Sequence, residues 1–143
     1  MENENINVRT TYLQMIQTSI ARMATTSAVF KGFCATIIAG ISAISFTEIN
    51  QWVLLLSIAP VICFFILDVY YLQLEKRFRA LYNMVRTGQH EVDFDLTPPK
   101  ARLLKCEEAS IWYCVKSPSI LLFYLPLAAI SAAVIIMKFK EVM

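Results

Sequence analysis

The chain has 143 residues, of which 57% are apolar and only 17% are charged. Ordinary soluble domains carry about 25% charged residues, so this composition and its mean hydropathy of +0.56 exclude an ordinary soluble domain and indicate a membrane protein. The net charge of +2 is too small to indicate a polyanionic partner, and we expect no direct contact with nucleic acid.

The N-terminal part of the chain predicts an amphipathic helix over residues 8–24. Apolar side chains recur there at helical spacing, and Arg9, Gln14, Gln17 and Arg22 occupy the rest of the helix surface. Two placements remain open at this point. The helix lies either in the membrane interface or against neighbouring cytosolic helices.

Three segments are long and apolar enough to cross a bilayer, which takes about 20 residues. Residues 27–47 and 52–71 form the first two spans, and the short segment 48–51 between them predicts a helical hairpin. Residues 118–137 carry no charge and predict a third span, with Ser117 as its N-cap and Pro118 at its first helical position. The alternative is a chain with two spans, whose last segment lies at the interface.

The positions of the basic residues predict the orientation. Lysine and arginine flank the open ends of the hairpin and are absent from its turn, so residues 48–51 face outward and the N-terminus is cytoplasmic. The second span continues as a cytosolic helix over residues 72–87, where Phe78, Leu81 and Tyr82 share an apolar face for packing. A polar loop over 88–99 and a short cytosolic helix over 100–116 follow.

The predicted fold class is therefore all-α. We expect an integral membrane helical protein with three transmembrane helices, namely a two-helix hairpin plus a C-terminal span, with an N-terminal amphipathic helix and a cytosolic helical extension. Residues 1–143 form a single membrane domain in this prediction. The bilayer is its first partner.

Two charged residues interrupt the spans of the hairpin. Lys31 and Asp68 lie at nearly equal distances along the chain from the turn, so a uniform helical rise places them at the same depth. An unpaired charge at mid-bilayer costs about 2.5–3.5 kcal/mol, and such residues usually pair. We expect an intramembrane ion pair that locks the hairpin near the cytosolic interface. Asp68 lining an ion path and Asp68 bonding a neighbouring subunit are the alternatives.

The first span also carries small residues in two adjacent rows, which allow close approach of helix backbones in lipid. We call this surface the small-residue face; it consists of Gly32, Ala35, Thr36, Ala39, Gly40 and Ala43. One row would contact the second span, and the other a second copy of the chain. Alternatively, the small residues only reflect their general frequency in membrane spans.

Residues for catalysis or cofactor binding are not evident. The one histidine, His90, lies in the polar loop, so no Ser/His/Asp or Cys/His set can be assembled. Asp93 and Asp95 lack the further ligands that a metal site needs, and the three glycines form no phosphate-binding loop. We expect no enzymatic activity, no metal and no cofactor.

Several short patterns of the chain resemble the RipA family of octameric bacterial membrane proteins. They are Lys31-Gly32-Phe33, Leu67-Asp68-x-Tyr70-Tyr71-Leu72-x-x-Glu75-x-x-Phe78-Arg79-x-Leu81-Tyr82-x-x-Val85-Arg86, and Leu122-Phe123-Tyr124. The resemblance extends over residues 10–137 in general layout. It implies a ring-shaped homo-oligomer, an octamer, in the bacterial inner membrane, similar to small effectors and accessory pores of antiphage defence.

Two functions are expected on this basis. The first is a homo-oligomeric pore, or ion channel, that permeabilises the membrane or disrupts its potential in antiviral defence. Three helices cannot enclose water alone, so a pore needs several copies. The second is a non-conducting membrane anchor or scaffold, whose cytosolic helices recruit a separately encoded defence protein.

Overall fold

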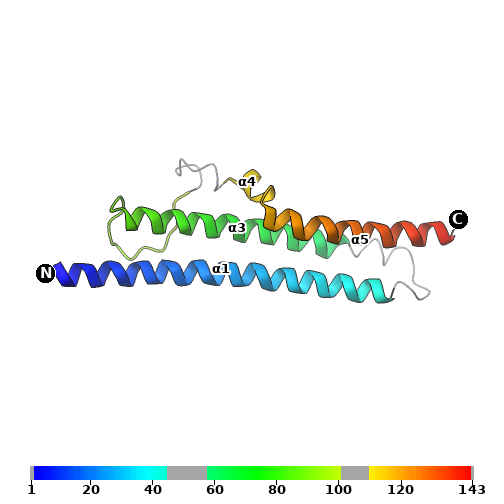
Figure 1. The fold of residues 1–143 in the computed structure, drawn as a ribbon, viewed down its shortest axis with the longest axis horizontal. Coiled ribbons are helices and arrows are strands. Elements are labelled where there is room, and N and C mark those ends of the chain that lie inside the picture. Colours follow the sequence, from blue (N-terminus) through cyan, green and yellow to red (C-terminus); the bar gives the residue numbers. More distant parts are fainter. Residues whose placement is uncertain (1, 45–57, 101–109, 143) are drawn as a thin grey trace. The chain divides into compact units, whose positions relative to one another are not determined.

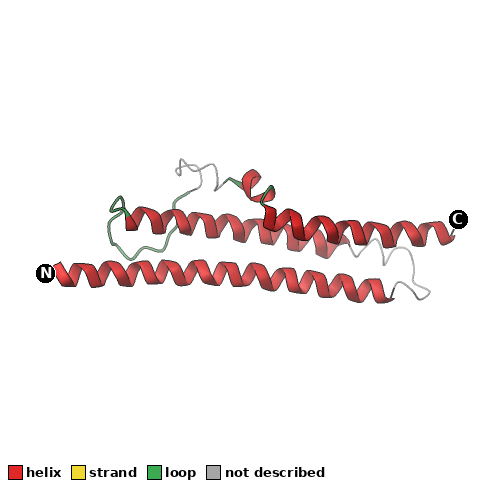
Figure 2. Cartoon of the chain, in the orientation of Figure 1, coloured by secondary structure: helices red, strands yellow, loops and turns green. Residues whose placement is uncertain are grey.

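The computed structural model describes residues 2–44, 58–100 and 110–142, and all regular elements in these ranges are helices (Figure 2). In chain order they are α1 (Glu2–Ile44), α3 (Ile58–Arg86), α4 (Ile111–Val115) and α5 (Pro118–Val142) (Figure 1). Helices α1, α3 and α5 each contain a stretch long and apolar enough to cross a membrane. The predicted all-α, multi-pass membrane architecture is therefore confirmed in these terms.

Helix α1 joins two elements that the sequence analysis separates. The predicted amphipathic helix over 8–24 and the described part of the first span belong to one uninterrupted helix. The junction contains no proline or glycine, and the hydroxyls of Thr25 and Thr26 donate hydrogen bonds to the carbonyls of Ala21 and Arg22 in the preceding turn. These hydroxyl groups are thus satisfied within the helix, and their bonds are compatible with its continuation through the junction.

The other predicted boundaries can be compared only in part. Helix α3 contains the described part of the second span together with its continuation over residues 72–87. The short helix predicted over 100–116 is described as helical only from Ile111 to Val115. The predicted turn at 48–51, the span residues 45–47 and 52–57, and residues 101–109 lie outside the described residues.

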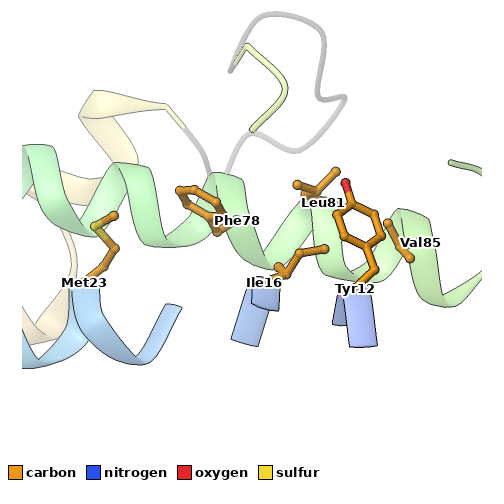
Figure 3. Packing of buried hydrophobic residues seen from close by; sticks show 6 residues of the cluster. All are labelled: Tyr12, Ile16, Met23, Phe78, Leu81 and Val85. Carbon is orange, nitrogen blue, oxygen red and sulfur yellow. The ribbon is translucent and has the colours of Figure 1, made fainter. Parts of the chain in front are cut away.

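The helices divide into two compact units. Unit 1 comprises residues 1–27 and 70–114. Its core, which we call the apolar cluster, is drawn in Figure 3 and consists of Tyr12, Ile16 and Met23 from α1 with Phe78, Leu81 and Val85 from α3. The N-terminal part of α1 therefore packs against the continuation of α3. This agrees with the helix packing of the second predicted placement, whose cytosolic location stays a prediction.

Hydrogen bonds from long side chains to backbone carbonyls complete unit 1. Arg9 donates to the carbonyls of Val85 and Arg86 at the end of α3, at 2.6 and 2.5 Å. The Val85 carbonyl also accepts a hydrogen bond from the Gly88 amide, at 3.2 Å. The arginine therefore adds donors to the last carbonyls of the helix and places a positive charge at the negative end of the helix dipole. Gly88, with a φ of 75°, then turns the chain into the loop.

Unit 2 comprises residues 28–69 and 115–143. It contains the C-terminal half of α1, the N-terminal half of α3 and helix α5. Phe30 of α1 lies against Phe64 of α3, with ring centroids 6.0 Å apart, and Phe65 of α3 meets Tyr124 of α5 edge-on at 5.4 Å. The three segments that carry the candidate spans therefore contact one another within this unit.

Candidate functional site

The charged residues of the spans meet in unit 2. The Lys31 ammonium on α1 lies 3.1 Å from Oδ2 of Asp68 on α3, a distance typical of an ion pair. The Asp68 side chain is completely buried, whereas that of Lys31 is 19% exposed. The structure thus brings together the two residues whose equal distance from the hairpin turn predicts an ion pair.

Helix α5 supplies a third member of this group. The same Lys31 ammonium donates a hydrogen bond to Oγ of Ser119, at 3.1 Å. We call Lys31, Asp68 and Ser119 the polar layer. Because its members come from α1, α3 and α5, the polar layer connects all three candidate spans at one level.

The Tyr124 hydroxyl adds a further polar atom beside this layer. It is buried and makes no hydrogen bond with good geometry to the described part of the chain. The Asp68 carboxylate and the Cys34 thiol nevertheless lie near this hydroxyl. Hence polar groups from all three helices gather around the Asp68 carboxylate.

The polar layer lies close to one end of the spans. Ser119 is the second residue of α5, which begins at Pro118, and Lys31 stands four residues into the first predicted span. At 1.5 Å per residue, both lie within about one helical turn of the span ends. Charges cost less there than at mid-bilayer, so the ion pair is favourably placed to join the helices.

This geometry bears on the alternative roles of Asp68. A carboxylate with no exposed surface and a cation at 3.1 Å is not open to water in a single chain. Its nearest cation belongs to its own chain, so bonding to a neighbouring subunit is not needed to neutralise it. No group of three or more metal-binding side chains occurs among residues 2–44, 58–100 and 110–142. The polar layer is suited to holding helices together.

The small-residue face is mostly uncovered within the described part of the chain. Gly32, Thr36, Ala39, Gly40 and Ala43 are exposed, and Ala35 is half-buried. A Cβ atom placed on Gly32 or Gly40 would meet no described atom within 4 Å. The described residues of the hairpin therefore do not use this surface for close helix packing.

The predicted cytosolic packing residues lie in or beside the core of unit 1. Phe78 and Leu81 belong to the apolar cluster, and Tyr82 packs against it. The polar layer and the apolar cluster belong to different units, so the structure groups the predicted residues into two separate sets.

Asp93 and Asp95 serve the loop that follows α3. Oδ1 of Asp93 accepts hydrogen bonds from the Asp95 amide at 3.0 Å and the Tyr12 hydroxyl at 3.3 Å. Hydrogen bonds from the Thr97 side chain and its backbone N–H lower the pKa of the Asp95 carboxyl. Each carboxylate thus accepts a hydrogen bond from a backbone amide two residues further on, as in an Asx turn.

Sequence reasoning missed Ser119 in the polar layer, and it missed Tyr12, Arg9 and Arg77 in unit 1. The Tyr12 hydroxyl donates to the Asp95 carbonyl at 2.5 Å, and Arg77 donates to the carbonyls of Pro98 and Pro99, at 2.9 Å each. The acceptors are backbone carbonyls, which leave no signal in a sequence. Ser119 gives only a weak indication of its role in the sequence, because it is a hydroxyl residue at the start of an otherwise uncharged span.

Comparison with known proteins gave no relative. No protein-family model matches the chain, and neither the curated proteins nor the solved structures contain a match.

Proposed function

We propose that the chain is a homo-oligomeric bacterial inner-membrane protein that forms a pore or disrupts the membrane potential, as an effector or accessory of antiphage defence. The oligomer is a ring, with eight subunits by resemblance to the RipA family. Three spans of one chain cannot enclose an aqueous path, so the activity requires self-association.

The observation that carries this proposal is the uncovered small-residue face of α1. It lies in a candidate span, and a Cβ placed on either of its glycines would meet no atom of the described residues within 4 Å. In lipid, helices associate through close packing of small residues, because the hydrophobic effect does not drive one apolar helix against another. A second copy of the chain fits this requirement.

The polar layer also supports the proposal, because it leaves no charge pair to be completed by a second subunit. Lys31 and Asp68 are neutralised within one chain, so each subunit enters the assembly with its intramembrane charges already paired. In this proposal the polar layer holds the subunit together, and the small-residue face joins it to the next subunit.

The alternative, a non-conducting anchor that recruits a separately encoded partner, rests on unit 1. This unit has a packed core of its own, and side chains bind its loop at several points. Such an ordered module outside the predicted spans offers a defined surface for a cytosolic protein.

A matched pair of substitutions separates these functions. Ala39→Leu enlarges a residue of the small-residue face, whereas Ala129→Leu makes the same change at an exposed position of α5. We expect Ala39→Leu to lower the oligomeric mass and to abolish dye leakage from liposomes, and Ala129→Leu to leave both unchanged. Leakage by wild type and both variants alike would contradict assembly through this face. An oligomer without leakage would favour the anchor.

A second substitution tests the same face at a glycine. Gly40→Leu adds a full side chain at a point with no described atom within 4 Å, so it does not clash with the described part of the subunit. We therefore expect loss of assembly and of cell toxicity without loss of helicity, measured by circular dichroism. Ile62→Leu, at an exposed position of α3, conserves side-chain volume and serves as the control.

A further inference from the structure

The short helix α4 carries three consecutive large apolar side chains outside the three candidate spans. Ile111 is 56% exposed, Trp112 76% and Tyr113 49%. The fourth residue of the helix, Cys114, is buried. A helix that buries its cysteine and exposes its tryptophan has turned its largest apolar side chain away from its own core, and this surface needs another apolar environment.

Two distances along the chain relate α4 to the ends of the candidate spans. Tyr113 stands five residues before Pro118, where the third candidate span begins. Its ring also lies under the ammonium of Lys76, with 4.2 Å to the ring centroid, and Lys76 follows Tyr71, the last residue of the second predicted span, by five residues of continuous helix. At 1.5 Å per residue, Lys76 lies about 7–8 Å beyond the span along α3.

That depth is the headgroup region. The hydrocarbon core of a bilayer is about 30 Å thick and the whole bilayer about 40–45 Å, which leaves about 5–8 Å of headgroups on each side. Tryptophan and tyrosine are enriched in this region because their rings are apolar and their edges are polar. The exposed Lys116, two residues after Cys114, adds a cation next to α4 in the sequence.

We propose that α4 is an interfacial anchor that lies in the headgroup layer at the N-terminal end of α5, with Trp112 inserted among the lipids. The bilayer interface is the occupant that covers Ile111, Trp112 and Tyr113. The proposal does not depend on whether the oligomer conducts.

Tryptophan fluorescence tests this placement, because the chain has two tryptophans and Trp52→Phe leaves only Trp112. The full-length variant is reconstituted into phosphatidylcholine vesicles in which the lipid carries bromine either near the headgroup or near the chain end. We expect stronger quenching by the shallow bromines than by the deep ones, and little quenching by aqueous iodide. The emission maximum should be shifted to the blue of that of free tryptophan.

Three results would overturn the proposal. Quenching by iodide and not by bromolipid would place Trp112 in water, and quenching by neither would place it against another copy or another protein. Stronger quenching by deep bromines would place it in the hydrocarbon core. If Trp52→Phe fails to fold, the Trp112 signal is obtained as the difference between wild type and Trp112→Phe, so that Trp52 stays unchanged.

Discussion

The ion pair of the polar layer predicts an asymmetric response to removal of its two partners. Lys31→Met leaves the Asp68 carboxylate, which is fully buried, without its cation and with a side chain too short to reach water. Breaking a buried pair in this way costs about 3–5 kcal/mol. Asp68→Ala leaves Lys31, which is 19% exposed and can extend its ammonium to the nearby interface. We expect that loss to be smaller, about 1–3 kcal/mol.

The measurement is the free energy of unfolding in mixed micelles, followed by helical circular dichroism. Ser119→Ala removes only the hydrogen bond at 3.1 Å and should cost about 1 kcal/mol, which makes it the matched control. The exchanged variant Lys31→Asp/Asp68→Lys should recover part of the loss, with a coupling energy of about 1–3 kcal/mol in the double-mutant cycle. Equal losses for the two single variants, together with additive effects in the cycle, would refute the ion-pair argument.

The remaining predictions concern topology and the loop of unit 1. In a chain whose native cysteines are replaced, a membrane-impermeant maleimide added outside the cell should label Glu48→Cys but not Lys100→Cys. Labelling of Glu48→Cys from the cytoplasmic side alone would contradict the predicted orientation, with residues 48–51 outside. Tyr12→Phe removes the bond to the Asp95 carbonyl and should cost about 1 kcal/mol, with faster amide exchange in residues 93–97; unchanged exchange would argue against this bond. Because hydrogen bonds from Thr97 lower the pKa of Asp95, their contribution to loop stability is fully present above the ordinary aspartate pKa of about 3.9. This contribution should be lost as the pH falls through the lowered pKa of Asp95. Amide exchange in the loop that does not respond to Asp95→Asn would contradict the stabilising role of these hydrogen bonds.

The pairing of Lys31 with Asp68 could be predicted because one physical rule connects the two residues. They lie on helices joined by a short predicted turn, and the helical rise is uniform, so counting from the turn gives their relative depth. Ser119 could not be placed in this way. It belongs to a span that follows a long polar connection, and no count of residues fixes its depth against the hairpin.

The continuity of α1 shows a second limit of sequence reasoning. The run Ala24-Thr25-Thr26-Ser27 reads as a boundary, since β-branched and hydroxyl residues are weak helix formers. In the structure the threonine hydroxyls bond to carbonyls of the preceding turn, and α1 is one helix from Glu2 to Ile44. Packing of Tyr12, Ile16 and Met23 against α3 stabilises its N-terminal part, which outweighs the weak local preference.

The mass of the particle in a lipid nanodisc tests the proposed homo-oligomer most directly. Light scattering coupled to size exclusion separates the protein mass from that of the lipid, and the chain mass is 16.3 kDa. We predict a single species at a whole multiple of this mass, eightfold by the family resemblance, and its dissociation by Ala39→Leu but not by Ala129→Leu. A wild-type particle with the mass of one chain, in the nanodisc and in mild detergent, would contradict the proposal.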